Sequence, residues 1–238
     1  MALEWMTMEI QAAIEGAQKA GADEIIVAES HHVVLDRLDK NMKYVLASRF
    51  SPSYLSGLDK SVDAVLMIGK HARAGVERGV LNHTGNTWVQ HQWLNGIEMG
   101  ETGFEMVYAG TLGIPVVFIS GDKEAVWEAK ALVKNMETIA VKAGISRYKA
   151  ISLHPCKAQE LIRAGVERAL ERREEIKPYI MKPPYKWCVE FTDTQYASNM
   201  NLIPGVQKIN DQTIMYKSRK FQDIVKVMLL KGFLYSKE

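Results

Sequence analysis

Four ionisable side chains, two of them directly after apolar runs of the sequence, could together bind a metal or move a proton. His31 follows the short apolar run EIIVA, and His71 follows the longer run VDAVLMIG. His83 lies in a glycine-bounded loop, and Glu101 stands in MGETGFEM, where a helix is expected to begin. In open α/β sheets, ligands collect outside the carboxyl ends of the strands. Three imidazoles and a carboxylate at this edge therefore predict a metal or acid–base site.

Each of these residues also has an ordinary structural interpretation. His31 could belong to a polar loop, His83 could be a loop residue, and Glu101 could be a favourable charge at a helix N-terminus. His71 is harder to explain by packing, because it follows an apolar strand directly and lies between Lys70 and Arg73. A structural role is expected for three further residues: His91, His154 and Asp122, the last as a helix N-cap. The sequence contains no HExxH, P-loop or GxGxxG motif.

The elements that must position these residues alternate between strands and helices, which predicts an α/β fold. Apolar runs without period-two alternation indicate buried strands of a parallel sheet that is covered by helices on both faces. Asn95-Gly96 predicts a hairpin within residues 87–100. Strands are expected at 24–28, 43–47, 62–69, 114–120 and 137–142, and helices at 3–20, 52–58, 101–112, 123–133, 156–174 and 219–234. The opening helix lacks the strand that usually precedes it in such a domain.

The second half of the chain has a different pattern of expected strands and helices, which predicts two structural units. Residues 177–186 include three prolines and resemble a linker, and short strands and helices follow. We divide the chain into an α/β metal-site domain, 1–150, and a C-terminal helix with a smaller α+β unit, 151–238. Because residues 186–238 are too few for a sturdy independent core, we expect this unit to take part in homo-oligomer formation.

Composition narrows the class of protein. The chain has 238 residues, of which 47% are hydrophobic and 24% charged, with a net charge of +2. This balance gives no basic excess for nucleic-acid binding. No apolar run approaches the roughly 18 residues of a membrane span, and the first residues do not resemble a signal peptide. Two distant cysteines, Cys156 and Cys188, exclude a disulfide framework and suit a reducing compartment. We therefore expect a cytoplasmic protein that binds neither nucleic acid nor membrane.

Several short motifs of this sequence, taken in order, resemble those of the M55 metallopeptidases, the zinc-dependent D-aminopeptidases. The resemblance runs from about residue 4 to the C-terminus. The matching stretches are ESH at 29–31, GKHARAG at 69–75, NHTG at 82–85, GETGFE at 100–105, IPVVFISGD at 114–122, and the later VEF and NLIPGV.

The resemblance implies particular roles for the four residues. In the family, two zinc ions are held by two histidines and three acidic residues. By position, His31, His71 and Glu101 would be metal ligands, and His83 would be the catalytic nucleophile or base. The family's other two acidic ligands lie in an Asp-x-Glu-Gly motif on its first strand, which this sequence does not contain. One zinc ion or none is therefore expected in this chain.

The resemblance implies an aminopeptidase-type hydrolase that releases N-terminal residues, D-configured in the family, from short peptides by means of a zinc-activated water. It also implies a homo-oligomeric ring, a decamer in the family. One alternative is a catalytically impaired or non-catalytic homologue that keeps peptide binding or assembly, because two acidic ligands are absent. A further alternative is that the first Met is internal to a longer gene product that carries the missing strand.

Overall fold

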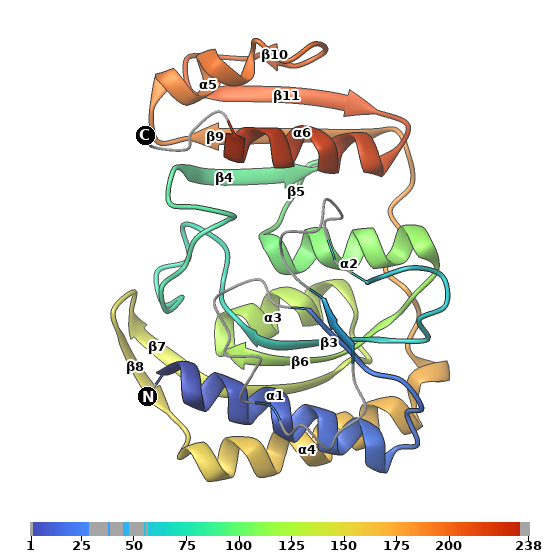
Figure 1. The fold of residues 1–238 in the computed structure, drawn as a ribbon. Helices are drawn as coiled ribbons and strands as arrows, with labels where there is room; N and C mark the ends of the chain where they lie inside the picture. Colours follow the sequence, from blue (N-terminus) through green and yellow to red (C-terminus); the bar gives the residue numbers. More distant parts are fainter. Residues whose placement is uncertain (1, 29–37, 39–44, 48–54, 56, 234–238) are drawn as a thin grey trace.

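The computed structural model describes residues 2–28, 38, 45–47, 55 and 57–233 (Figure 1). The helices are α1 (Ala2–Lys19), α2 (Glu101–Leu112), α3 (Lys123–Leu132), α4 (Pro155–Glu171), the 3-10 helix η2 (Arg173–Glu175), α5 (Thr194–Met200) and α6 (Phe221–Phe233). The strands are β1 (Ile26–Ala28), β2 (Val45–Ala47), β3 (Val65–Lys70), β4 (Val89–Leu94), β5 (Ile97–Glu98), β6 (Val116–Asp122), β7 (Glu137–Ser146), β8 (Lys149–Ser152), β9 (Tyr185–Phe191), β10 (Gln207–Lys208) and β11 (Thr213–Ser218). Within this part of the chain, no helix is both long and apolar enough to cross a lipid bilayer.

The first sheet has the order β3-β6-β7-β8, and its first three strands are parallel. Every residue of β6 is buried, which explains why this strand is apolar without alternation. Helices α1 and α4 pack on one face through alanines and aliphatic side chains such as Ala13, Ile162 and Val166. Helices α2 and α3 cover the other face (Figure 1). The α/β class and the helical cover on both faces are confirmed.

The second sheet is antiparallel and has the order β10-β11-β9-β4-β5. Its β4–β5 hairpin comes from the first half of the chain, so the two sheets interleave in sequence. The predicted turn is present, with Asn95 and Gly96 both at positive φ. In the sheet, Trp187 is fully buried and its indole N–H donates to Oε1 of Gln92 on the hairpin, at 3.1 Å. Helix α4 packs with the first sheet, and the division of the chain at residue 150 stays a prediction.

Helix α2 lies between the two sheets and contributes to both hydrophobic cores (Figure 1). Phe104 and Val107 pack into the core beneath the second sheet. Met106 and Ala109 pack into the core on the first sheet. Both sides of the helix are therefore apolar, and its first residue, Glu101, is held at the junction of the two layers.

Strands β1 and β2 pair in parallel with each other and form a sheet separate from β3. A cavity of about 340 Å³ is lined by α1, β1 and the end of β3, and it reaches His71 and His83. It therefore opens beside the carboxyl end of β3, next to the two histidines.

Some expectations need correction or fall outside the described residues. Strand β8 was not expected, because all four of its residues are exposed and show no alternation. The helix expected over 156–174 ends at Glu171, and the short turn η2 follows it. The helix expected around 52–58 falls largely on residues outside the described ranges.

Candidate metal centre

His71 follows β3 directly, at the carboxyl edge of the first sheet. The pairing of β3 with β6 is irregular between Met67 and Lys70, and Lys70 pairs with Gly121. Gly121 has φ +149°, and a Cβ there would lie 2.1 Å from the carbonyl oxygen of Lys70. A glycine is therefore required for the end of β3 to approach β6 this closely. Irregularities of this kind often re-aim a side chain beside an active site.

Both histidines of the site have one ring nitrogen fixed by the backbone. Nδ1 of His71 lies 2.9 Å from the carbonyl oxygen of Ala72, and Nδ1 of His83 lies 2.8 Å from that of Leu81. A carbonyl oxygen can only accept, so in each ring Nδ1 carries the proton and Nε2 keeps its lone pair. Such contacts select the tautomer and orient the ring of a metal-binding histidine.

The loop that carries His83 is held by buried polar side chains. The Asn82 amide donates to the carbonyl oxygens of Val76 and Gly79, at 2.6 and 3.0 Å. Asp122 caps α3 by accepting from the N–H of Glu124, as expected, and its other oxygen accepts from the N–H of Val80 at 2.6 Å. This second contact of Asp122 ties the loop to the end of β6 and was not predicted from the sequence.

Glu101 is placed by the start of α2. Its Oε1 accepts from the N–H of Gly85 at 2.7 Å, which joins the helix to the His83 loop. The preceding residue, Gly100, is the helix N-cap, and a Cβ there would lie 2.6 Å from Cβ of Arg73. Glycine at position 100 therefore lets the helix start come close to the segment that carries His71.

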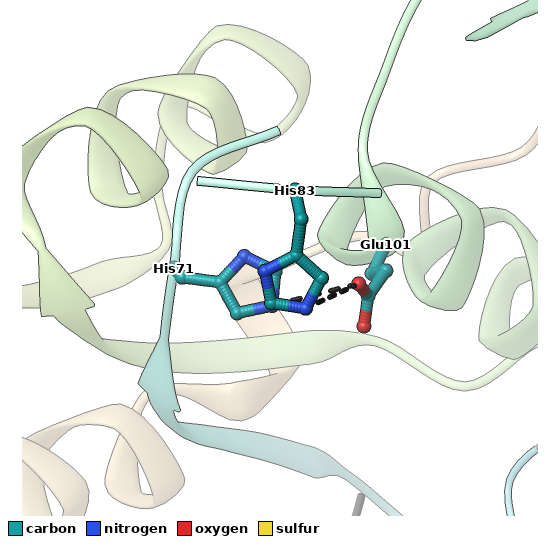
Figure 2. A group of neighbouring side chains, drawn as sticks. All are labelled: His71, His83 and Glu101. Carbon is teal, nitrogen blue, oxygen red and sulfur yellow. Dashed lines mark ion pairs between the residues drawn. The ribbon is translucent and has the colours of Figure 1, made fainter. Parts of the chain in front are cut away.

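Three of the predicted residues converge on one point (Figure 2). Nε2 of His71 lies 3.5 Å from Oε1 of Glu101, and Nε2 of His83 lies 3.6 Å from the same oxygen. Four-coordinate zinc has ligands at about 2.0–2.2 Å, so two tetrahedral ligand atoms are about 3.3–3.6 Å apart. One candidate ligand atom from each residue lies within 4.8 Å of the others. The donor set and its spacing therefore fit one zinc ion. The fourth predicted residue, His31, lies outside the described residues.

The electrostatics of the site favour the protonation states that bind metal. Burial lowers the pKa of His71 to about 4, and this effect outweighs the attraction of Glu101 for the imidazolium. Burial alone would raise the pKa of Glu101, but His71, Lys70 and the N–H of Gly85 together bring it below its ordinary value. A neutral imidazole and an ionised carboxylate thus face each other at neutral pH.

Further ionisable groups surround this centre, and sequence reasoning assigned them no role. Lys70 is paired with Glu105 in the interior. Glu128 on α3 accepts from the N–H of Arg73 at 3.0 Å, and burial raises the pKa of its carboxyl to about 7. Their signal in the sequence was weak, because single Lys and Glu residues are common on exposed helix faces. Of the two histidines expected to be structural, His154 caps α4, and His91 bonds Glu98 at 2.6 Å.

A partly buried imidazole pair facing a carboxylate at the edge of an α/β sheet is the type of donor set found in zinc hydrolases. The family model of peptidase M55, D-aminopeptidase, matches residues 1–230, and the chain belongs to this family. A curated relative, the D-aminopeptidase of Bacillus subtilis (strain 168), is 30% identical over 232 residues, which cover 94% of this chain and 84% of the relative.

A solved structure agrees with this assignment. It is the Zn-dependent D-aminopeptidase DppA from Bacillus subtilis, described as a self-compartmentalizing protease. The similarity has a TM-score of 0.92 at 29% identity, and it covers 98% of this chain and 86% of that chain. The family expected from the short motifs is therefore confirmed.

Proposed function

We propose that this protein is a metal-dependent aminopeptidase that releases N-terminal residues, D-configured ones included, from short peptides. The observation that carries the proposal is the convergence of His71, His83 and Glu101, so that a metal held by His71 and Glu101 would lie beside Nε2 of His83. The names of the two relatives, a D-aminopeptidase and a zinc-dependent D-aminopeptidase, support the reaction and the metal.

The residues of the site divide the work between holding a metal and moving a proton. We assign His71 and Glu101 as metal ligands, with His31 as the further ligand that the family resemblance implies. Bound zinc supplies a polarising charge for the scissile carbonyl and a water of lowered pKa. His83 acts as the catalytic base, because its Nε2 has a lone pair and its loop is held separately from the strand that carries His71. The contact with Leu81 keeps this nitrogen directed at the site.

We further propose that the chain acts in the cytoplasm as a homo-oligomer, a ring in keeping with the family. The self-compartmentalizing description of the similar solved protein supports assembly. Apolar side chains are exposed on the C-terminal unit, where we expect contacts between copies: Leu202 is 78% exposed and Ile209 55%. Exposed apolar groups of this kind are typical of protein–protein contacts when they cluster.

A second candidate is a homologue that binds peptides and assembles but hydrolyses them poorly. One observation favours it: the described residues offer a single group of three potential metal ligands, His83 included, which suits at most one metal ion and not the two of the family. Carboxylates normally bridge paired zinc ions and offset their charge, and within the described ranges this group has Glu101 alone.

The direct test is an assay of the hydrolysis of D-alanyl and L-alanyl dipeptides, in which release of the free amino acid is measured. The protein is assayed after chelation, and again after zinc is added back. Activity that is lost on chelation and restored by zinc, with preference for the D-alanyl substrate, is expected. Peptide binding by calorimetry without turnover under either condition would instead support the second candidate.

A further inference from the structure

A buried ion pair lies next to the metal centre, and the proposed chemistry does not use it. The ammonium of Lys70 donates to both carboxylate oxygens of Glu105, at 2.8 and 2.7 Å. The two side chains are only 11% and 10% exposed. Lys70 immediately precedes His71, and Glu105 lies one helical turn after Glu101.

The position of this pair matters more than the stability it contributes. Bringing two charges out of water is costly, and a buried pair is often no more stable than well-packed apolar residues of similar volume. Residues four apart on a helix share a face, so Glu101 and Glu105 point toward the same neighbours. The pair therefore joins the end of β3 to α2 beside the two ligands that these elements carry, and it limits changes in the distance between His71 and Glu101.

The Lys70–Glu105 pair also determines the net charge beside the metal site. A lone ammonium at position 70 would repel a divalent cation at His71, and a lone carboxylate at position 105 would compete with Glu101 as a ligand. Because both oxygens of Glu105 accept from Lys70, this carboxylate is held out of the ligand set. Together the two side chains carry no net charge, so the neighbouring ligands can accept a cation.

We propose that Lys70 and Glu105 are positioning residues, a charge-balanced clamp that fixes His71 against Glu101 and keeps Glu105 from binding the metal. This inference rests on the proposed function, since it concerns the same site. It adds two residues that neither touch the reacting atoms nor belong to the predicted ligand set.

The test is a Co²⁺ titration of the full chain, followed by visible absorption, because the Co²⁺ spectrum reports the number and geometry of its ligands. Glu105→Gln leaves the ammonium uncompensated, and we expect Co²⁺ affinity to fall by about tenfold or more. Lys70→Met frees the Glu105 carboxylate, and we expect a changed spectrum as this group enters the ligand set. Lys70→Arg keeps the charge and both hydrogen bonds, and it should retain the original spectrum.

Two further variants separate positioning from general stability. Lys70→Met combined with Glu105→Gln removes both charges, so we expect affinity closer to that of the unaltered chain but a spectrum that stays changed. This double variant also provides a test if one of the single variants does not fold. The matched control is Lys19→Met, which breaks the more exposed Lys19–Glu167 pair, 2.9 Å long, between α1 and α4. It should leave affinity and spectrum unaltered.

Identical Co²⁺ affinity and spectra in all variants would overturn the inference, as would a lack of any Co²⁺ binding by the unaltered chain. Failure of the proposed function is distinguishable from both outcomes. In that case dipeptides are not cleaved, while the Co²⁺ spectra still respond to position 70 and position 105.

Discussion

His71 and His83 stack face to face, with ring centroids 3.9 Å apart and an angle of 21° between the ring planes. Each ring has its Nδ1 against a backbone carbonyl, so both Nε2 atoms point toward Glu101 (Figure 2). Two imidazolium ions could not be held this close without strong repulsion. The stack therefore presents two imidazole Nε2 atoms to the same carboxylate, and the separate roles that we assign to the two histidines can be tested one at a time.

His83→Ala should abolish peptide turnover and leave zinc content unchanged, because we assign His83 to proton transfer and not to metal binding. Hydrolysis assays and metal analysis on the same samples check this. His154→Ala, which removes only a helix cap, is the control and should retain activity. Loss of zinc together with activity would make His83 a ligand.

Metal analysis of the chain should give clearly fewer than two zinc ions per molecule. The reason is that the described residues provide one group of potential metal ligands, in which Glu101 is the single carboxylate for a doubly charged ion and His83 is assigned to proton transfer. Glu101→Gln should lower zinc affinity by about tenfold or more relative to the unaltered chain, because it removes the negative charge of the carboxylate. Two tightly bound zinc ions with brisk cleavage of D-alanyl dipeptides would contradict this expectation and show that other carboxylates reach the site.

Gly100→Ala should weaken metal binding without unfolding the protein. The added methyl group would lie 2.6 Å from Cβ of Arg73, so the start of α2 must move away from the segment that carries His71. We expect zinc affinity to fall while thermal unfolding changes little. Gly96→Ala in the exposed hairpin turn is a useful comparison, because no atom lies within 4 Å of its Cβ position but the residue has φ +83°. This variant should lose stability and keep its zinc affinity.

Glu128→Gln should change how stability depends on pH. Burial raises the pKa of Glu128 to about 7, from an ordinary value of 4.5, so the folded chain binds this proton more tightly than the unfolded chain. The free energy of unfolding must then fall as pH rises from about 4.5 to about 7. Glutamine has no proton to lose. By pH 8 the free energy of unfolding of the variant should therefore exceed that of the unaltered chain by up to roughly 3 kcal/mol.

Urea unfolding at pH 5 and pH 8 measures this difference for Glu128→Gln. The same change at an exposed position, Glu171→Gln, is the matched control. It should leave the difference in the free energy of unfolding between pH 5 and pH 8 the same as in the unaltered chain. An equal pH response in both variants would rule out a buried, proton-binding Glu128.

Light scattering at micromolar concentration should find an oligomer, assembled partly through the C-terminal unit. Replacing the exposed Leu202 and Ile209 by serine should shift the protein toward smaller species. Ile151→Ser on strand β8 is the control, because Ile151 is also exposed, at 69%, but belongs to the other sheet. A monomeric unaltered chain would refute the expectation.

The features that could be predicted from the sequence are mostly those that depend on residues close together in the chain. The Asn95-Gly96 turn and the helix that begins at Glu101 depend on neighbouring residues, and both were found correctly. The close approach of His71 and Glu101 was expected because His71 follows a strand and Glu101 begins a helix on the same, ligand-binding side of the sheet. Short motifs in a fixed order were sufficient to indicate the family.

What sequence reasoning missed depends on residues far apart in the chain. The hydrogen bond from the N–H of Val80 to Asp122 and the pairing of Lys70 with Glu105 arise only when distant segments meet. The membership of β4 and β5 in the second sheet depends on pairing with β9, almost a hundred residues later. Strand β8 has four exposed residues and therefore no apolar pattern to detect.

Helix α2 supplies apolar side chains to both cores, and this has a consequence for folding. If either sheet came apart alone, one side of α2 would be left exposed to water, at a cost of about 25 cal/mol for each Å² of apolar surface. The two layers should therefore lose their structure together, in one cooperative transition. Amide hydrogens of β6 and β9 would then exchange at similar rates, although these strands belong to different sheets.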